Sequence, residues 1–330
     1  MSEAIRLAAV GLGRQMREVL VPALTRGAPY ELAGACDTDP EKVASFRRVF
    51  NVAAGFTDYR EMFDATALDA VLVAVGHDSN GPIIAEALRH GVHVFVEKTP
   101  VRTAREADEL TALARSVDRR VMVGFNRRFM NPYAEARRLA TAPAFGGVRL
   151  FQSQFHAGWY DEDAFIVNHI IHHLDLARFL LGEVDITHVQ RVRVGERMEG
   201  YTISLASRGT ADGARAIGTI QAGSLLDARY PVERLELVGT GGTIIVEDLG
   251  DVVYHPPTTR DGTPVGAVAA PAERRWEPSP HQPPHRNLAG YEDELREFFA
   301  AVRTGRRPMP DLADARCTLA LIDQIHARLR

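Results

Sequence analysis

Apolar residues in the first 125 positions form short continuous runs rather than an alternating pattern. Stretches at 17–24, 82–90 and 104–117 separate some of these runs and are predicted to be helices. Near-continuous apolar strands that alternate with helices are typical of a parallel sheet covered on both faces. The pattern predicts a doubly wound, Rossmann-type α/β domain with five strands, at residues 5–10, 30–36, 70–76, 92–96 and 120–125.

From residue 148 the pattern changes, and most apolar segments alternate with polar positions, as in strands with one buried face. A long helix carrying His172 is expected on one face of this sheet. The second part of the chain is therefore predicted to be α+β with an open mixed, mostly antiparallel sheet. Its other face needs cover, so we expect a homodimer or homotetramer. The strands are predicted at 148–154, 189–194, 201–207, 216–222, 234–238 and 243–247.

The first run ends in a turn that contains Gly11 and Gly13, and the second run ends at Asp37. Gly11 permits a tight turn, Gly13 lets the backbone approach a pyrophosphate, and the following helix offers free N–H groups. An acid at the end of the second strand accepts hydrogen bonds from ribose hydroxyls and repels a 2′-phosphate, which favours NAD over NADP. Met16 replaces the third glycine of the dinucleotide fingerprint. The alternative role for Asp37 is to cap a helix that begins near Pro40.

Ligands of doubly wound sheets lie at the carboxyl ends of the strands. The predicted strand ends and the turns behind them therefore define one rim. The residues expected to bind the cofactor on that rim are Gly11, Gly13, Arg14, Gln15, Asp37, Gly76, His77, Asn80, Glu97 and Lys98.

Lys98 is unusual for this composition, because only Lys42 and Lys98 among the 39 lysine and arginine residues are lysine. Lys42 fits a helix surface, whereas Lys98 directly follows the buried run 92–96. A guanidinium stays charged at any usable pH, but an ammonium is compact and changes its protonation state more readily. The position of Lys98 therefore favours a functional role over a lysine that occurs there by chance.

Composition narrows the possible partners. A net charge of −4 gives no global basic field, so nucleic acid is not an expected partner. Cys36 and Cys317 lie far apart and suggest no disulfide framework, which fits a cytoplasmic protein. The chain shows no signal-peptide pattern and no apolar run near the roughly 18 residues of a membrane span, so no membrane association is expected.

Several motifs together resemble the glucose–fructose oxidoreductase / inositol dehydrogenase / rhizopine-catabolism (Gfo/Idh/MocA) family. They include Gly11-x-Gly13, Asp37, Glu97-Lys98, the run from Gly124 to Phe129, and Asn168-x-x-x-His172-x-x-Asp175-Leu176. The resemblance implies an NAD(P)-dependent oxidoreductase that acts on a secondary alcohol or ketone of a sugar, amino sugar or cyclitol. It also implies that the lysine after the fourth strand and a histidine of the long helix serve the chemistry. Two departures from the family are Thr99, where it usually has proline, and Asn168, where it has aspartate.

Alcohol oxidation releases a proton, and histidine is a suitable base near neutral pH. We therefore expect His172 to be the general acid/base and Lys98 its electrostatic and proton-relay partner; the reverse assignment stays open. An amide cannot take up the proton, so Asn168 is expected to orient a hydroxyl. His169, His172 and His173 lack a Glu or Cys that would complete a ligand set, so no metal is expected.

The residues expected to bind substrate are Asn126, Arg128, His156, Trp159, Tyr160, Asn168 and His172. For the arginines near the end of the last strand, interdomain ion pairing is the alternative. For Trp159 and Tyr160 it is core packing. Asp175 is expected either to hold the His172 imidazole or to lie at the helix surface or cap N–H groups.

The length of 330 residues allows two domains. We expect a dinucleotide-binding domain over 1–124 and a substrate-binding and oligomerisation domain over 125–330, whose closing helices within 291–330 pack at the domain junction. The proline-rich segment 255–287 is a flap, an oligomer arm or a disordered connection. The expected activity is a dehydrogenase or ketoreductase. The alternatives are a lyase or hydrolase that oxidises its substrate transiently with NAD, and a non-catalytic dinucleotide-binding regulator.

Overall fold

The structure is a computed structural model that describes residues 4–24, 30–158, 165–209, 215–226, 231–256, 259–260, 263–264, 274–276 and 290–330. The chain divides into two compact units. The first comprises Met1–Asn126 and Gly290–Leu319, and the second comprises Arg127–Ala289 and Ala320–Arg330. This division differs from the predicted one, because residues 290–319 group with the N-terminal part of the chain rather than with the second domain.

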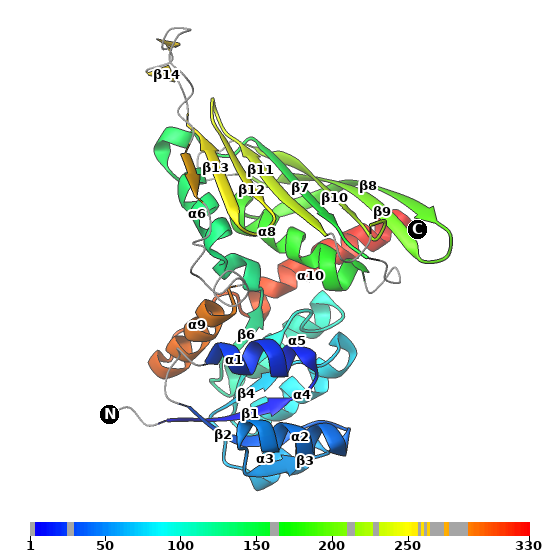
Figure 1. The fold of residues 1–330 in the computed structure, drawn as a ribbon, viewed down its shortest axis with the longest axis vertical. Helices are drawn as coiled ribbons and strands as arrows, with labels where there is room; N and C mark the ends of the chain where they lie inside the picture. The colour runs from blue at the N-terminus through cyan, green and yellow to red at the C-terminus, as the bar shows by residue number, and fades with distance from the viewer. Residues whose placement is uncertain are drawn as a thin grey trace. The chain divides into compact units, whose positions relative to one another are not determined.

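The first unit contains a six-stranded parallel sheet in the order β3-β2-β1-β4-β5-β6 (Figure 1). The predicted Rossmann-type fold is confirmed, but the predicted number of five strands is wrong. The missed strand, β3, is three residues long and lies at the sheet edge, so it carries no periodic pattern. The strands are β1 Ile5–Val10, β2 Tyr30–Cys36, β3 Ala54–Phe56, β4 Ala70–Val73, β5 His93–Glu97 and β6 Val121–Gly124.

Side-chain caps mark the starts of several helices in the first unit. Asp39 and Asp58 accept backbone N–H bonds at the starts of α2 and α3, and Thr103 does so at the start of α5. The helix predicted at 82–90 begins earlier, at His77, and contains Pro82 within it. The helical segments are η1 Gln15–Leu20, α1 Val21–Ala23, α2 Pro40–Phe50, α3 Tyr59–Ala65, α4 His77–Arg89, α5 Ala104–Ser116 and α9 Tyr291–Thr304.

Helix α9 belongs to this unit although it lies near the end of the chain. Figure 1 shows it beside α1, and the ring of its Phe298 lies 5.9 Å from that of Phe95 on β5. Both phenylalanines are fully buried. The apolar face of α9 therefore completes the core of the first unit.

The second unit is built on an eight-stranded mixed sheet in the order β16-β13-β12-β11-β7-β10-β9-β8. Among the described strands, β7 and β10 pair in parallel and the other pairs are antiparallel, which confirms the predicted mixed, mostly antiparallel sheet. The strands are β7 Leu150–His156, β8 Val184–Val194, β9 Met198–Ser207, β10 Ile217–Gly223, β11 Val232–Val238, β12 Thr243–Glu247, β13 Asp251–His255 and β16 Arg274–Trp276.

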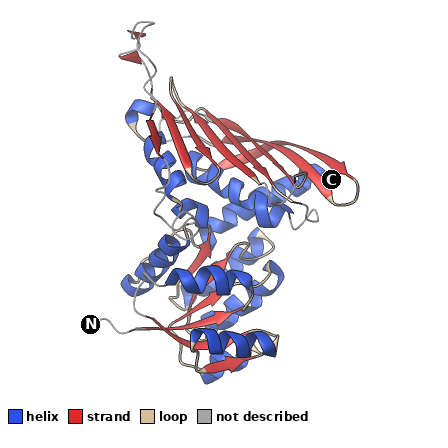
Figure 2. Ribbon diagram, in the orientation of Figure 1, coloured by secondary structure: helices blue, strands red, loops and turns tan. Residues whose placement is uncertain are grey.

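Helices α6 (Asn131–Ala140) and α8 (Ile171–Leu181) lie on one face of this sheet (Figure 2). The inward positions of β7, at Phe151, Ser153 and Phe155, are buried against them. The rest of the helical structure is η3 Asn126–Phe129, η4 Pro143–Phe145, η5 Ile166–Ile170 and α10 Leu312–Leu329, of which the last has residues in both units. A small hairpin pairs β14 Thr259–Arg260 with β15 Thr263–Pro264.

Candidate functional site

The glycine turn after β1 has one glycine that packing requires. Gly11 has φ +83°, and a Cβ there would lie 2.5 Å from the carbonyl oxygen of Ala74. Its N–H donates to the carbonyl of Cys36 at 2.9 Å, which joins the turn to the end of β2. Only glycine fits this position without a shift of the backbone.

Gly13 and Gly76 face open space instead. A Cβ on either residue would meet no atom within 4 Å. They lie behind the carboxyl ends of β1 and β4, which are neighbours in the sheet. The structure therefore leaves a cradle at the place where a dinucleotide pyrophosphate approaches the backbone in this fold.

Asp37 is tied to that turn. One of its carboxylate oxygens accepts the N–H of Leu12 at 2.8 Å, and the other accepts the N–H of Asp39 at 3.0 Å. The cap of α2 is Asp39, which accepts the N–H of Glu41 at 2.9 Å. The capping alternative for Asp37 is thus wrong, and its carboxylate lies at the strand end as an NAD-binding acid would.

The three residues that follow Gly13 have different surroundings. Arg14 is exposed and pairs with Glu18 at 2.8 Å, so its guanidinium lies at the surface. Gln15 opens the π-helical segment η1 and donates its amide N–H to Glu97 at 2.6 Å. Met16 is fully buried at the position of the missing glycine. Short π-helical segments are common at functional sites, and this one joins the glycine turn to the end of β5.

Lys98 follows β5 directly. Its backbone N–H donates to Glu97 Oε2 at 3.2 Å, and the peptide bond between Lys98 and Thr99 is cis. The buried Asn80 donates its amide N–H to the carbonyl of Thr99 at 2.9 Å. Asn80 therefore holds the backbone beside Lys98, while His77, the first residue of α4, is partly exposed and pairs with Asp78 at 3.3 Å.

In the second unit, α8 carries His172 and His173, and both are buried. Burial lowers the pKa of His173 to about 4, and the Ser153 hydroxyl lies 2.7 Å from its Nδ1. Asn168 lies in η5, a π-helical segment. A turn wider than that of an α-helix therefore lies between Asn168 and His172.

Arg128 forms a buried ion pair. Its guanidinium donates to both carboxylate oxygens of Asp175, at 2.8 and 2.6 Å. The predicted surface role of Asp175 is wrong, because its side chain is buried and pairs with Arg128 inside the second unit. Its predicted role of holding the His172 imidazole stays a prediction. The pairing uses Nε and one Nη of the guanidinium that we predicted to bind substrate. Asn126, which opens η3, is buried.

A second buried charge cluster was not predicted from the sequence. Arg127 donates to both oxygens of Glu233 at 2.7 and 2.6 Å, and the Tyr133 hydroxyl donates to the same carboxylate at 2.6 Å. Burial alone would raise the pKa of Glu233, but the Arg127 charge and these hydrogen bonds lower it to about 2. The available signal was that Glu233 shares the inward phase of β11 with Leu235 and Leu237.

His156 is not brought together with His172. The ring of its neighbour Phe155 stacks on His169 at 5.4 Å, on the α8 side of the sheet. Successive strand residues point to opposite faces, and His156 lines a hollow on the other face with Gln190, Thr202 and Gln221. Trp159 and Tyr160 lie outside the described residues, as does most of segment 255–287.

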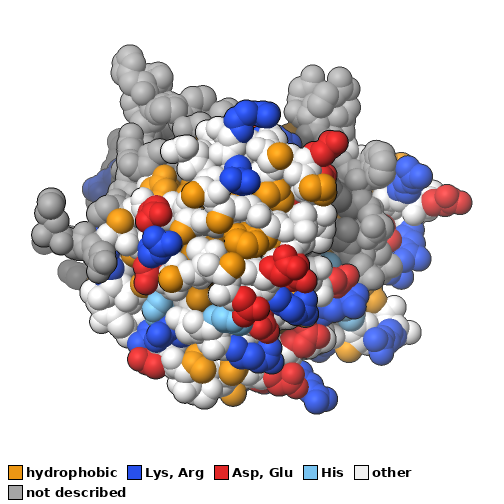
Figure 3. All heavy atoms as spheres, turned by 90° about the horizontal axis from the view of Figure 1, so that it is seen from below, with side chains coloured by type: hydrophobic (Ala, Val, Ile, Leu, Met, Phe, Trp, Pro, Cys, Tyr) orange, Lys and Arg blue, Asp and Glu red, His pale blue; other side chains and the backbone are white. Residues whose placement is uncertain are grey.

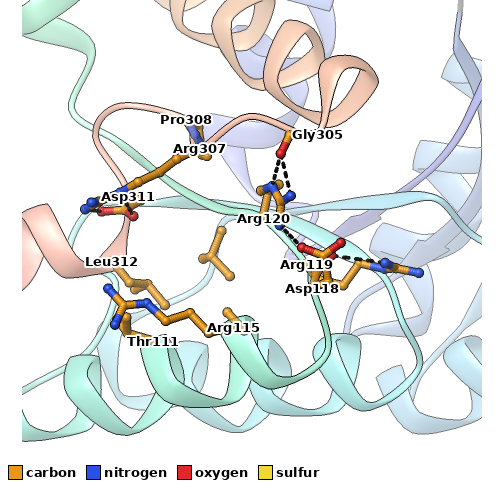
Figure 4. A pocket seen from close by; sticks show the side chains of 12 residues that line it. Thr111, Arg115, Asp118, Arg119, Arg120, Gly305, Arg307, Pro308, Asp311 and Leu312 are labelled. Carbon is orange, nitrogen blue, oxygen red and sulfur yellow. Dashed lines mark hydrogen bonds and ion pairs between the residues drawn. The ribbon is translucent and has the colours of Figure 1, made fainter.

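A different hollow in the first unit lies at the amino end of β6 (Figure 4). Arg115, Arg119, Arg120 and Arg307 line it, but most of these guanidiniums have protein partners. Arg120 donates to the carbonyl of Gly305 and to Asp118, and Arg307 donates to Asp311. The hollow thus lies at the strand end opposite the glycine turn, and its charges are largely satisfied within the protein.

The face shown in Figure 3 carries basic and acidic side chains interspersed rather than gathered by sign. In the described part of the chain, no group of three or more His, Cys, Asp or Glu side chains is arranged to hold a metal. Among the same residues, no helix is long and apolar enough to span a membrane.

Comparison with known proteins shows which family the first unit resembles. The profile of the Gfo/Idh/MocA oxidoreductases, described as having an NAD-binding Rossmann fold, matches residues 5–125. This part of the chain is therefore similar to the NAD-binding domain of that oxidoreductase family. Inositol 2-dehydrogenase of Rhizobium meliloti is 25% identical over 337 residues, which cover 97% of this chain and 95% of that protein.

A solved dehydrogenase from Chromobacterium violaceum has a TM-score of 0.86 and 26% identity, and it covers 99% of this chain and 95% of its own. Other matches are partial. They span 57% of the YceM protein of Salmonella typhimurium and 65% of D-apiose dehydrogenase of Rhizobium rhizogenes, at 31% and 23% identity. Those alignments cover 54% and 64% of this chain. The family's cofactor, NAD, fits the cradle left by Gly13 and Gly76.

Proposed function

We propose that this chain is an NAD-dependent dehydrogenase that acts on a secondary alcohol, or on the corresponding ketone, of a sugar, amino sugar or cyclitol. The observation that supports the proposal is the cradle at the glycine turn, where Gly13 and Gly76 face open space and the carboxylate of Asp37 accepts the N–H of Leu12 in the same turn. Relatives that include inositol 2-dehydrogenase and D-apiose dehydrogenase support the substrate class.

Gly11, Gly13, Asp37 and Gly76 would hold the dinucleotide. When bound, NAD supplies a nicotinamide ring that accepts the hydride from the substrate carbon. The acid beside the ribose favours NAD over NADP, because a 2′-phosphate would meet the Asp37 charge. The exposed Arg14, paired with Glu18, provides no buried counter-charge for such a phosphate.

His172 and Lys98 would carry the proton chemistry. As the C–H bond of the alcohol breaks, the O–H proton passes to the His172 imidazole, and the Lys98 ammonium stabilises the negative charge that develops on oxygen. Asn168, which cannot accept a proton, would orient the hydroxyl. The buried Arg128–Asp175 pair would fix the start of the second unit rather than bind substrate.

The test is NADH formation over a panel of cyclitols, pentoses, hexoses and amino sugars. We expect turnover on one of these classes, with kcat lowered about 10²-fold or more in His172→Ala and in Lys98→Met. His188→Ala, at an exposed position of β8, is the matched histidine control. Lys98→Arg keeps the positive charge but replaces the compact ammonium with a guanidinium. It therefore shows whether turnover needs the charge alone or an ammonium group.

Wild-type turnover in folded His172→Ala and Lys98→Met variants would contradict the assigned roles. NAD binding with no turnover on any class would instead favour a non-catalytic regulator. Substrate conversion without net NADH would favour transient oxidation within an elimination or hydrolysis.

A further inference from the structure

Helix α9 places a glutamate against the end of β5. Glu294 and Phe298 are one helical turn apart and share a face of α9. Phe95 and Glu97 are two residues apart and share a face of β5. Because the rings of Phe298 and Phe95 pack at 5.9 Å, Glu294 lies on the side of α9 that faces Glu97.

Both carboxyl groups are removed from water. Glu294 is 0% exposed and Glu97 is 6% exposed. Two carboxylates that share a dry site cannot both ionise at low cost, so one of them retains a proton. The pair therefore carries a single negative charge, on either Glu97 or Glu294.

Their hydrogen bonds are unequal. Glu97 accepts the Gln15 amide N–H at 2.6 Å and the Lys98 backbone N–H at 3.2 Å. Within the described part of the chain, neither carboxyl oxygen of Glu294 has a hydrogen-bond partner. Donors stabilise a carboxylate over a carboxylic acid, so the charge belongs on Glu97.

The surrounding charges act in the same direction. Burial and the charge of Glu97 raise the pKa of Glu294 well above its usual range. Burial also raises the pKa of Glu97, but the Lys98 charge and the Gln15 hydrogen bond lower it. Helix α1, which also packs on α9, contributes Val21, Pro22 and Ala23, none of which carries a charge.

We propose that Glu294 is a neutral positioning residue that keeps its proton and so leaves the single negative charge of the pair on Glu97, beside Lys98. The fixed carboxylate of Glu97 then holds two parts of the site. It orients Gln15 behind the glycine turn, and it favours the ammonium form of Lys98. This rests on the proposed function only where it concerns turnover.

The stability test is independent of activity. The folded protein keeps a proton on Glu294 that the unfolded chain releases above a pKa near 4.5. The unfolded state then binds fewer protons, so wild-type stability falls as the pH rises above that value. We expect Glu294→Gln, which mimics the neutral acid, to raise the urea midpoint over wild type, with a gain that grows from about pH 5 to about pH 8.

Glu297→Gln is the matched control on the same helix. Glu297 accepts from Arg306 at 2.6 Å, so its substitution removes an ion pair and should lower the urea midpoint or leave it unchanged. If Glu294→Gln lowers the midpoint, and the loss grows with pH, then Glu294 is an ionised and paired carboxylate and the proposal is overturned.

Infrared spectroscopy gives a direct reading of the proton. At neutral pH the wild-type protein should show the C=O stretching band of a protonated carboxyl group, and Glu294→Gln should lose that band while Glu297→Gln keeps it. Retention of the band in Glu294→Gln would place the proton elsewhere and overturn the proposal.

The pH dependence of NADH formation should differ between variants of the two glutamates. We expect Glu97→Gln, which removes the charge beside Lys98, to move the pH dependence of NADH formation by about one pH unit. Glu294→Gln preserves the charge of Glu97, so the pH dependence of NADH formation should stay as in the wild type. An equal displacement in both variants would show that the two glutamates share the charge. If the chain turns over no substrate, the urea and infrared results still decide the state of Glu294.

Discussion

Gly11 and Gly13 belong to one turn but have different surroundings. A side chain at Gly11 would press on the Ala74 carbonyl, and its φ of +83° is unfavourable for other residues. A side chain at Gly13 would project into open space. The first glycine is therefore required by the fold, whereas the second leaves room for a ligand.

Substitution of Gly11 and of Gly13 should therefore have different effects. Gly11→Ala should cost about 1–3 kcal/mol of unfolding free energy, because the positive φ and the short contact both penalise a Cβ. Gly13→Ala should leave stability within about 0.5 kcal/mol but raise the Kd of NADH about tenfold, a loss of roughly 1.4 kcal/mol. Urea unfolding and NADH fluorescence titration measure the two effects. Equal losses of stability in both variants would contradict it.

The positions of single site residues could be predicted from the sequence better than their partners. The turn glycines, Asp37 and Lys98 could be placed on one rim, because a parallel sheet brings its strand ends together. The partner of each side chain could not be predicted. Nothing local in the sequence indicates that Gln15 bonds to Glu97 or that Arg128 bonds to Asp175, since those pairings depend on tertiary packing.

At the scale of elements, two acids near the end of β2 have separate tasks. Asp37 binds the glycine turn through the N–H of Leu12, and Asp39 caps α2. Asp39→Ala should therefore lower stability by about 1 kcal/mol without changing NAD affinity.

Asp37→Ala should instead weaken NAD binding about tenfold and narrow the preference for NAD over NADP, because it removes both an acceptor and a repulsive charge. Titration of both variants with NADH and NADPH checks this pair. A loss of NADH affinity in Asp39→Ala equal to that in Asp37→Ala would contradict the division of roles.

Elements with strong periodicity could be predicted from the sequence, and weakly patterned ones could not. The strand at 243–247 and the helix at 104–117 agree with β12 and α5 within one residue. β3 and β13 were missed, because the first is very short and the second is a brief run beside the proline-rich segment. The π-helical segments η1 and η5 were missed since no residue pattern distinguishes them from α-helix.

At the scale of the whole molecule, the open face of the eight-stranded sheet bears on assembly. Leu150 and Ile217 are exposed at paired positions of β7 and β10, and Val232 of β11 is exposed at the other end of β7, where it pairs with His156. The helices α6 and α8 cover the other face. We retain the sequence-based prediction that a second copy of the chain covers the open one.

Light scattering should therefore give a dimer or tetramer. Ile217→Lys, at an exposed apolar position paired with Leu150, should shift the protein toward the monomer at a given concentration, because burying an unpaired ammonium is costly. Val49→Lys, at an exposed position of α2, is the control that should not. A monomeric wild-type protein would contradict the prediction.

The discontinuous first unit has a consequence for synthesis. The apolar side of β5 that carries Phe95 is covered by α9, which leaves the ribosome almost two hundred residues later. Domains generally fold as they emerge, but this one cannot close its core until the rest of the chain has been made. During that interval the nascent sheet leaves this apolar side of β5 uncovered, so the native core forms only after translation has passed α9.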